Sequence, residues 1–471
     1  MKNDLIFDDT AYTVETLELE GTRLVYQAFE HIPYVKNPVD AQMQTLSIFV
    51  PEVFYNGGSI GSYNLKTAPI FLPNTIGGYM PGPSERPGRD RRGQVTASFW
   101  ALRHGYVVVS PGARGRGMKD GEGRYIGTAP AAICDLKAAV RYLRHNAQRI
   151  PGDVEKIISN GTSAGGAMSS LLGSTGNHPD YEPFLQAMGA AEEKDNIFAA
   201  SCYCPITNLD HADMAYEWEF CGINEFHGMR FERPKPGESE PRFIPVDGEM
   251  TKEEQTMSEE LKPRFPAYLN SLNLKDKEGK KLVLDPQGTG SFLEYVKSFV
   301  IASAQKELDR GADLSELSWL VMNHGKVSDI DFPAYVLFRT RMKVTPAFDN
   351  TALGTPENEL FGTKTCQYRH FTEYSTKHST VDGQMAEPKQ IKMMNPMYYI
   401  DDQEAVKAEH FRIRHGAVDR DTSLAVSAML AVKLQNNGVD AQLAYPWGIP
   451  HAGDYDLEEM FQWIDGICSS L

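Results

Sequence analysis

The sequence lacks any apolar run long enough to cross a membrane. No stretch of about 18 consecutive apolar residues occurs among its 471 residues. Residues 1–10 also lack the basic region followed by an apolar run that a secretory signal peptide requires. These absences predict a cytoplasmic protein that has no membrane partner.

Cysteine is scarce, and its spacing excludes two classes of protein. The six cysteines form no C-x-x-C pair and no spacing typical of zinc ligands; they are Cys134, Cys202, Cys204, Cys221, Cys366 and Cys468. We therefore expect no disulfide framework, no metal site and no cofactor. Cys202 and Cys204 alternate along an expected strand, so we interpret them as buried apolar side chains that point to one face.

Basic residues are outnumbered by acidic ones. The chain has 47 Lys and Arg against 63 Asp and Glu, a formal net charge of -16. This charge disfavours binding to nucleic acid and to anionic membrane surfaces, because both are negatively charged. A small-molecule substrate remains the expected partner.

The hydrophobic content of 41% is sufficient for a large buried core. Apolar runs typical of buried strands alternate with helical patterns at both ends of the chain, as in βαβ units. The expected strands are residues 44–50, 68–73, 106–110, 156–160, 411–415 and 441–446, and the expected helices are residues 130–145, 164–173, 423–434 and 457–468. This order predicts an α/β protein with one mostly parallel, doubly wound sheet.

The middle of the chain has a different composition. Charged helical stretches and Pro/Gly-rich loops, such as residues 231–248, occupy the segment from 207 to 396. We therefore predict that residues 1–206 and 397–471 form one core, and that residues 207–396 form a large inserted lid domain. No internal repeats and no low-complexity segments occur.

A candidate nucleophile lies between an expected strand and an expected helix. Residues 161–165 (GTSAG) match G-x-S-x-G, with KIISN before them and AGGAMSSLLG overlapping and following. In such a turn Gly161 and Gly165 make room for the backbone, and the hydroxyl of Ser163 projects above the sheet. The free N–H groups at the helix start stabilise an oxyanion. The motif predicts a serine esterase of the α/β-hydrolase fold.

A serine nucleophile requires a base and an orienting acid, which follow it in the order acid, then histidine. His451 lies in the loop after the last expected strand, and Asp419 follows the strand FRIRH one βαβ unit earlier. We rank these two first. The alternatives are Asp421, Asp454 and Asp456 for the acid and His410 and His415 for the base, with Asp421 as the main competitor.

The oxyanion hole requires a second N–H from the loop after an early strand. Residues 74–79 (NTIGGY) directly follow the strand APIFLP. We predict that the N–H groups of Gly77 and Ala164 form the hole, with Gly78 as the alternative to Gly77.

Several further motifs resemble those of one family, the bacterial tannases, which hydrolyse galloyl esters. They are PNT at 73–75, GRG at 115–117, NGTSAGGA from 160, YCPI at 203–206, HADMAYEW at 211–218, IRHG at 413–416 and PH at 450–451. The resemblance covers essentially the whole chain. It implies that the triad is Ser163, Asp419 and His451, which favours Asp419 over Asp421.

The resemblance also implies a site for the galloyl ring. Lys343, Glu357 and Asp421 match the lysine and two acids that bind the three adjacent hydroxyls of the ring. Such charge-assisted hydrogen bonds contribute roughly 1.5–3 kcal/mol each. Ile206 and Pro356 are expected as apolar walls, with Gly78 also near the substrate.

The resulting expectation is hydrolysis of galloyl esters of tannins and alkyl gallates through an acyl-enzyme, with release of gallic acid. The alternatives are a broader carboxylesterase or feruloyl esterase, and a noncatalytic binding protein with the same fold. Residues 81–93 and 226–248 are where we expect family members to differ, so the preferred alcohol is not predicted.

Overall fold

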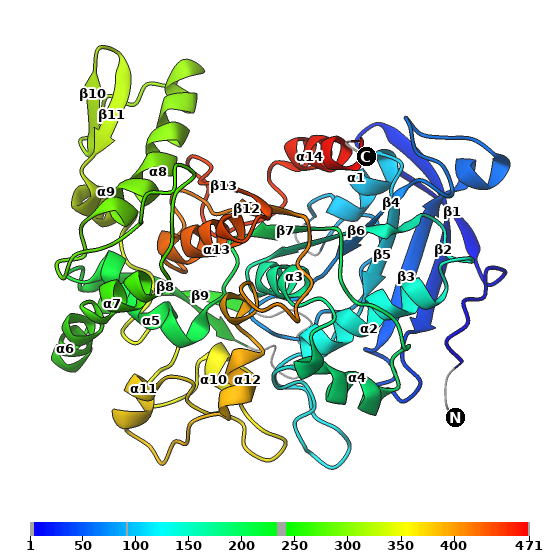
Figure 1. The fold of residues 1–471 in the computed structure, drawn as a ribbon, viewed down its shortest axis with the longest axis horizontal. Coiled ribbons are helices and arrows are strands. Elements are labelled where there is room, and N and C mark those ends of the chain that lie inside the picture. Colours follow the sequence, from blue (N-terminus) through cyan, green and yellow to red (C-terminus); the bar gives the residue numbers. More distant parts are fainter. Residues whose placement is uncertain (1–3, 91–92, 233–241, 470–471) are drawn as a thin grey trace.

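A nine-stranded sheet forms the centre of the computed structural model, which describes residues 4–90, 93–232 and 242–469 (Figure 1). In spatial order the strands are β1 (Thr13–Leu19), β2 (Thr22–Pro33), β3 (Thr45–Pro51), β5 (Val107–Pro111), β4 (Pro69–Pro73), β6 (Asp153–Thr162), β7 (Ala199–Tyr203), β12 (His410–Arg414) and β13 (Asp440–Ala444). The pairs from β1 to β5 are antiparallel, and those from β5 to β13 are parallel. The predicted α/β-hydrolase fold is confirmed, as is its mostly parallel sheet.

Helices cover both faces of this sheet, which explains why the central strands are continuous apolar runs. In Figure 1, α1 (Ala97–Arg103) and α14 (Leu457–Ser469) lie together on one side, and α2 (Ala131–His145) and α3 (Ala164–Ser174) lie on the other. Further along, α4 (Glu182–Met188) packs on α2, and α13 (Leu424–Asn436) packs on β12 and β13. Three short 3₁₀ helices, η1 (Glu52–Asn56), η2 (Pro179–Tyr181) and η3 (Pro396–Tyr398), lie in connections.

The first two strands extend the sheet and were not predicted. β1 and β2 pair in register from Thr13 with Ala28 to Leu19 with Thr22. No residue of β1 is buried, and Val14 is 54% exposed. Its sequence, TVETLEL, therefore lacks the apolar run that identifies a buried strand, and pairing with β2 decides its conformation.

The segment from 207 to 396 lies to one side of the sheet, in green and yellow in Figure 1. Its elements are α5 (Leu209–Phe220), β8 (Glu225–Glu232), β9 (Arg242–Glu249), α6 (Lys252–Leu261), α7 (Arg264–Ser271), α8 (Ser291–Asp309), β10 (Leu320–Asn323), β11 (Lys326–Ile330), α9 (Phe332–Arg339), α10 (Pro356–Leu360), α11 (Glu373–Lys377) and α12 (Pro388–Lys392). In the part of the chain that the structure describes, β8 pairs with β9 and β10 with β11, and none of the four joins the large sheet. The division into core and lid domain stays a prediction.

The prediction of a Pro/Gly-rich loop at 231–248 is wrong for the residues of this range that the structure describes. Residues 242–249 form β9 and pair antiparallel with β8, with His227 opposite Asp247. A Cβ on Gly248 would lie 2.7 Å from the ring of Phe226 on the facing strand, so a side chain there would require that ring to move. Residues 233–241 and 91–92, which fall in the two stretches expected to vary, lie outside the described residues.

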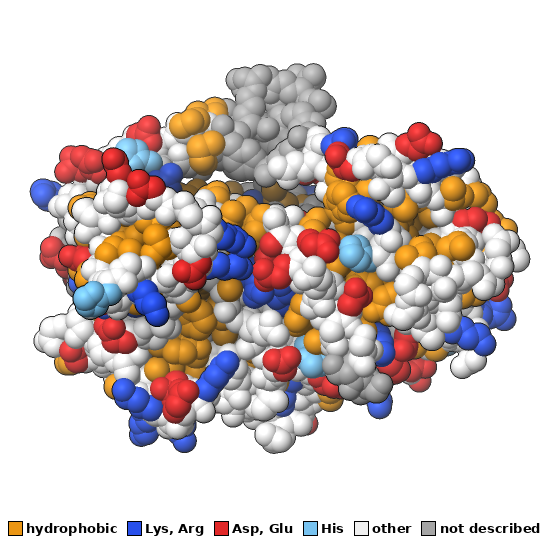
Figure 2. Space-filling model, turned by 90° about the horizontal axis from the view of Figure 1, so that it is seen from above, with side chains coloured by type: hydrophobic (Ala, Val, Ile, Leu, Met, Phe, Trp, Pro, Cys, Tyr) orange, Lys and Arg blue, Asp and Glu red, His pale blue; other side chains and the backbone are white. Residues whose placement is uncertain are grey.

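The surface carries charges of both signs. Figure 2 shows acidic and basic side chains interspersed over one face, with apolar side chains between them. Within the described ranges, every helix is too short or too polar to span a bilayer.

Candidate active site

The site residues gather at one edge of the sheet because parallel strands end there together. Thr162 on β6 pairs with Tyr203 on β7, Tyr203 pairs with Arg414 on β12, and Arg414 pairs with Ala444 on β13. The loops after these strands therefore start level with one another. This alignment brings four segments together, which begin at Ser163, Cys204, His415 and Tyr445.

Ser163 occupies the sharp turn between β6 and α3 that the motif predicts. Its backbone has φ 61° and ψ -122°, a combination that few residues other than glycine adopt. Its N–H donates to the carbonyl of Tyr203 at 3.0 Å. The hydroxyl caps no backbone N–H of α3, so Oγ is available for a reaction partner. Such strain at a strand-to-helix turn is typical of a nucleophile elbow.

The two glycines that flank Ser163 have no room for a side chain. A Cβ on Gly161 would lie 2.3 Å from the carbonyl oxygen of Gly165. On Gly165 it would lie 2.6 Å from Asn74 Oδ1 and 2.8 Å from the carbonyl oxygen of Ile76. The loop after β4 is therefore packed directly against the nucleophile turn.

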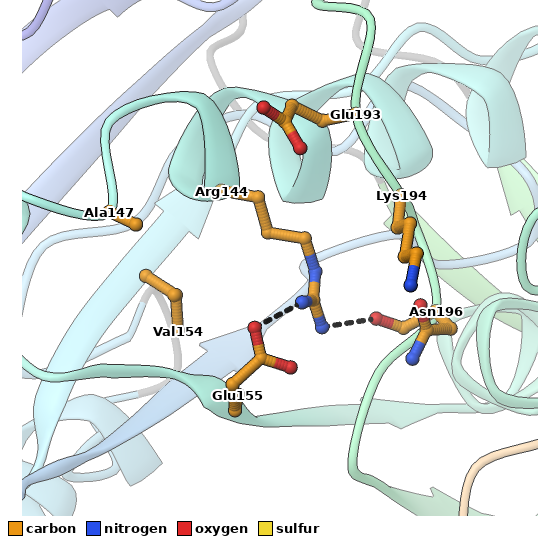
Figure 3. A pocket seen from close by; sticks show the side chains of 7 residues that line it. All are labelled: Arg144, Ala147, Val154, Glu155, Glu193, Lys194 and Asn196. Atoms are coloured by element: carbon orange, nitrogen blue, oxygen red, sulfur yellow. Dashed lines mark hydrogen bonds and ion pairs between the residues drawn. The ribbon is translucent and has the colours of Figure 1, made fainter.

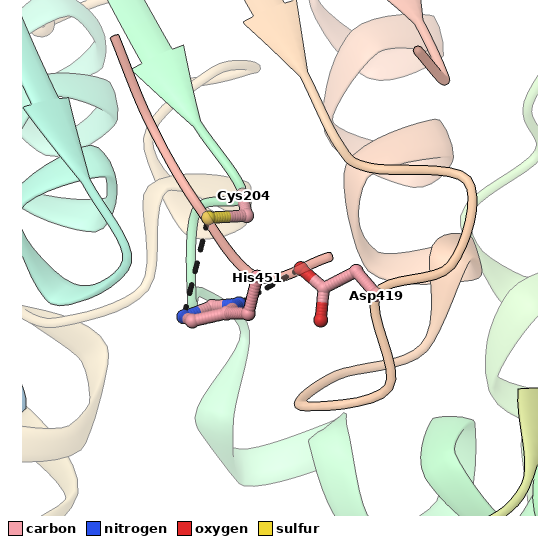
Figure 4. A group of neighbouring side chains, drawn as sticks. All are labelled: Cys204, Asp419 and His451. Atoms are coloured by element: carbon pink, nitrogen blue, oxygen red, sulfur yellow. Dashed lines mark hydrogen bonds and ion pairs between the residues drawn. The ribbon is translucent and has the colours of Figure 1, made fainter. Parts of the chain in front are cut away.

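His451 and Asp419 form a hydrogen-bonded pair, drawn in Figure 4, with Nδ1 and Oδ2 2.8 Å apart. Asp419 is fully buried, whereas the side chain of His451 is 25% exposed. Burial raises the pKa of a carboxyl, but the charges of His451 and His415 lower the pKa of Asp419 to about 2. Burial likewise lowers the pKa of an imidazole, but Asp419 and Asp421 raise that of His451 well above its usual value. The acid is thus ionised and orients the imidazole.

Backbone contacts tie the acid loop to the histidine loop. The N–H of Val418 donates to the carbonyl of Ile449 at 3.1 Å, and that of Ala417 donates to Pro446 at 2.9 Å. Gly416 packs so closely that a Cβ would lie 2.0 Å from the oxygen of Ile449. The two loops that carry the catalytic pair are therefore hydrogen-bonded and closely packed against each other.

The alternative bases and acids have other partners. His415 also lies 3.4 Å from Asp419 Oδ2, but it is fully buried, and burial lowers its pKa. His410 pairs with Asp440 at the opposite end of β12. Of the other acids, Asp454 accepts from Asn160, and Asp456 pairs with Arg412 and accepts from the hydroxyl of Tyr203.

The predicted oxyanion donors lie in the nucleophile turn and in the loop that packs against it. Ala164 begins α3, and the N–H groups of Ala164, Gly77 and Gly78 donate no hydrogen bond to any described residue. Nothing lies within 4 Å of a Cβ built on Gly77, so this part of the loop faces open space. Both Gly77 and its alternative Gly78 remain suitable donors.

The three charged residues predicted to bind the ring lie together. Lys343 Nζ is 2.9 Å from Asp421 Oδ1, and Lys343 interacts electrostatically with Glu357 on α10 as well. Both side chains of the Lys343–Asp421 pair are about one-fifth exposed, at 21% and 19%. Burial raises the pKa of Glu357, although Lys343 opposes this. The cluster offers an ammonium and two carboxyls at one accessible point.

Apolar and aromatic groups complete the surroundings. Ile206 is buried and donates its N–H to the carbonyl of Ser163 at 3.3 Å. Its own carbonyl accepts from the hydroxyl of Tyr79 at 2.5 Å, and Tyr79 lies within electrostatic range of Glu357. Pro356, the first residue of α10, is exposed beside Glu357.

Cys204 differs from its predicted role. β7 ends at Tyr203, and Cys204 turns away with φ 34° instead of continuing the strand. Its sulfur lies 4.0 Å from His451 Nε2 (Figure 4). The thiol donates to the carbonyl of Ala452 at 3.3 Å and lies close to the backbone N–H of Ser163. Although Cys204 is buried as predicted, it contacts both the nucleophile turn and the base. Only the positive φ, which the sequence does not reveal, places it there.

Two supporting residues were missed by sequence reasoning. Arg116 donates from Nε to the carbonyl of Gly78 at 2.5 Å and pairs with Glu359 on α10, so it joins the oxyanion loop to the helix that carries Glu357. Tyr216 on α5 contacts the segments of Lys343 and Asp421 through its hydroxyl. Their only sequence signal is their position in the motifs GRG and HADMAYEW.

Two groups of possible metal ligands occur in the described residues. One is Cys204, Asp419 and His451, in which the imidazole and the carboxylate already bind each other. The other is His178, Asp402 and Glu404. His178 Nδ1 accepts the N–H of Asp180 at 3.1 Å, and Nε2 lies 3.2 Å from Asp402 Oδ2. Both ring nitrogens of His178 therefore have partners within the protein.

A pocket of about 330 Å³ lies far from this site (Figure 3). It is lined by Arg144, Ala147, Val154, Glu155, Glu193, Lys194 and Asn196. Val154 and Glu155 are the second and third residues of β6, whereas Ser163 follows its last residue. The pocket and the nucleophile are therefore at opposite ends of a ten-residue strand, roughly 30 Å apart. Arg144 is held there by Glu155 and the carbonyl of Asn196.

Comparisons with known proteins found one matching family model and several similar solved structures. Residues 89–257 match the family described as BD-FAE. The chain is similar to tannase from Lactobacillus plantarum, with 46% identity, a TM-score of 0.96 and 99% of each chain covered. It is also similar to Fusobacterium nucleatum tannase, with 46% identity, a TM-score of 0.94 and coverage of 99% of this chain and 100% of that one. A tannin acyl hydrolase in complex with ethyl gallate has 46% identity, a TM-score of 0.93 and 99% coverage of each chain. No curated protein matches the chain.

Proposed function

The chain belongs to the tannase family, and on this premise we propose that it hydrolyses galloyl esters with Ser163, His451 and Asp419 as its catalytic triad. The observation that carries the proposal is the Lys343–Asp421 pair, at 2.9 Å, two residues from the acid that holds His451. A site for a polyhydroxylated ring thus adjoins machinery for acyl transfer.

In the first step Ser163 Oγ attacks the ester carbonyl while His451 Nε2 takes the hydroxyl proton. His451 then gives this proton to the departing alcohol. The hydrogen bond between His451 Nδ1 and Asp419 keeps Nε2 directed toward the substrate and stabilises the imidazolium that forms.

The tetrahedral intermediate carries a negative charge on the former carbonyl oxygen. The N–H groups of Ala164 and Gly77, which donate to none of the described residues, are suited to bind it. Ala164 also lies at the positive end of the dipole of α3. Water then attacks the galloyl-enzyme in the second half of the reaction, with the same groups in the same roles, and gallic acid leaves.

The three hydroxyls of a galloyl ring match the charged cluster. The carboxyl groups of Asp421 and Glu357 accept phenolic O–H groups, and the ammonium of Lys343 donates to phenolic oxygens. Lys343 and Glu357 come from the segment 207–396, which we propose as a lid domain, and Asp421 comes from the core. Both parts of the chain therefore contribute to recognition of the acid half of the ester.

The proposal is tested by hydrolysis of methyl gallate, methyl ferulate and methyl benzoate by the wild type and by Ser163→Ala. We expect turnover of the gallate far above that of the other two esters, and loss of all turnover in the variant. Comparable turnover of all three esters would instead support a general carboxylesterase. Turnover that survives in Ser163→Ala would exclude Ser163 as the nucleophile.

A further inference from the structure

We propose that Tyr216 is a positioning residue for the galloyl site, because its hydroxyl joins the chain segment of Lys343 to that of Asp421. Tyr216 lies on α5, and its hydroxyl contacts the backbone of both segments. The inference rests on the proposed function, since it assigns a role in recognition of the hydroxylated ring.

The hydroxyl of Tyr216 makes three hydrogen bonds to the backbone. It donates to the carbonyl oxygen of Arg420 at 3.0 Å. It accepts the N–H of Met342 at 3.2 Å and that of Lys343 at 3.1 Å. One donor and two acceptor positions are all that a phenolic hydroxyl offers, so this group is fully used within the protein.

The partners of the hydroxyl explain its importance. Arg420 stands between Asp419 and Asp421, and Asp421 binds Lys343 side chain to side chain. The carbonyl of Arg420 and the N–H of Lys343 belong to different parts of the chain, 77 positions apart (420 minus 343). A single oxygen atom thus sets the separation of the two backbones from which the lysine and the acid project.

The ring of Tyr216 is itself fixed. It is fully buried, its centroid lies 4.6 Å from that of Phe220, and the guanidinium of Arg341 lies over it at 5.4 Å. Arg341 forms a buried ion pair with Glu217, the next residue of α5. Burial, although opposed by Arg341 and Lys343, also raises the pKa of Tyr216 to about 12, so the hydroxyl keeps its proton at neutral pH. A fixed ring holds the oxygen at one position.

The contact predicts a selective defect. Without the hydroxyl, the two N–H groups and the carbonyl lose their common partner, and the segments of Lys343 and Asp421 can separate. Asp419 still binds His451, and Ser163 is untouched, so the chemical step remains for an ester whose ring has no hydroxyls. The defect should therefore affect methyl gallate and spare methyl benzoate.

The test is the ratio of kcat/KM for methyl gallate to kcat/KM for methyl benzoate, in the wild type and in Tyr216→Phe. We expect this ratio to fall about 10-fold in Tyr216→Phe, mainly through a higher KM for the gallate, which is the effect of about one hydrogen bond. The matched control is Tyr34→Phe, which removes another buried hydroxyl that donates to a backbone carbonyl, that of Gly112 at 2.7 Å. The control should keep the wild-type ratio. A loss of turnover for both esters in equal measure would show a merely structural role and overturn the inference.

A second comparison asks whether Tyr216 acts through Lys343. In a Lys343→Met background, Tyr216→Phe should change the gallate-to-benzoate ratio of kcat/KM by less than about two-fold. The reason is that substitutions of two coupled residues do not have additive effects. An undiminished effect of Tyr216→Phe in that background would overturn the inference.

If Tyr216→Phe does not fold, 4-aminophenylalanine at position 216 is used for the test instead. Its amine still donates to the carbonyl of Arg420 but accepts one N–H at most. Its ratio should lie below that of the wild type, and an unchanged ratio would refute the role of the hydroxyl.

The two proposals fail in different ways. A wild-type protein that does not prefer the gallate over the benzoate would remove the proposed function and the role of Tyr216 with it. A wild-type preference that survives intact in Tyr216→Phe would remove the role of Tyr216 alone.

Discussion

The backbone N–H of Asp421 donates to Asp419 Oδ1 at 2.8 Å, while the other oxygen of Asp419 binds His451. The acid proposed for catalysis and the acid proposed for ring binding therefore belong to one hydrogen-bonded turn. The two acids nevertheless have separable roles, because only Asp419 contacts the base and only Asp421 contacts Lys343.

Asp419→Asn is expected to lower kcat about 10⁴-fold for every ester. The amide cannot stabilise the imidazolium and favours the wrong tautomer of His451. Steady-state kinetics with methyl gallate and methyl benzoate check this, and both esters should be affected alike. A defect confined to the gallate would mean that Asp419 belongs to the ring site instead.

Lys343→Met is expected to lower kcat/KM for methyl gallate by roughly 10- to 100-fold, the effect of one or more charge-assisted hydrogen bonds. For methyl benzoate, which offers no phenolic group, kcat/KM should change by less than about two-fold. The matched control is Lys277→Met at an exposed position, which should alter neither value. Equal losses for both esters would contradict the assigned role of Lys343.

The pH dependence of kcat/KM should show the raised pKa of His451. The base accepts a proton only when neutral, so activity should increase with pH, with a midpoint above the usual imidazole value of about 6.5. Burial acts to lower this pKa, and the carboxylates of Asp419 and Asp421 outweigh it. The measurement is a pH profile for methyl benzoate.

Asp421→Asn tests the direction in which the midpoint of this pH profile moves when a nearby negative charge is removed. Removal of a negative charge near His451 makes the imidazolium less stable, so the midpoint should move to lower pH. Asp440→Asn removes an exposed acid that pairs with His410 at the far end of β12, and should leave the midpoint unchanged. A midpoint that stays in place or moves upward in Asp421→Asn would contradict the electrostatic account.

Gly416→Ala should abolish turnover and lower the apparent Tm. Its Cβ would lie 2.0 Å from the carbonyl oxygen of Ile449 and 2.6 Å from that of Pro450, both in the loop before His451. Overpacking of this kind costs about 1–3 kcal/mol. Gly466→Ala in α14 is the control, because no atom lies within 4 Å of its Cβ; there alanine should raise helix stability slightly. Thermal unfolding and turnover of both variants decide the point.

Much of the core was predictable from local patterns. The strands at 68–73 and 106–110 are apolar except for Ser110 because both of their faces are covered, and such runs are visible without a structure. The turn at Ser163 was predictable for the same reason, since Gly161 and Gly165 have steric causes within a few residues of the nucleophile. The described part of the loop expected at 231–248 was predicted wrongly, because the strand conformation of β9 depends on pairing with β8 and not on its own composition.

The sequence by itself determined the elements whose cause is local: buried strands, amphipathic helices and a glycine-flanked serine between a strand and a helix. Its motifs also indicated the family. Only the tertiary structure decided which distant groups meet, because contacts between segments leave no periodic signal in either one. The positive φ that turns the sulfur of Cys204 toward His451, and the hydroxyl of Tyr216 that joins Lys343 to the carbonyl of Arg420, exist only once the chain is folded.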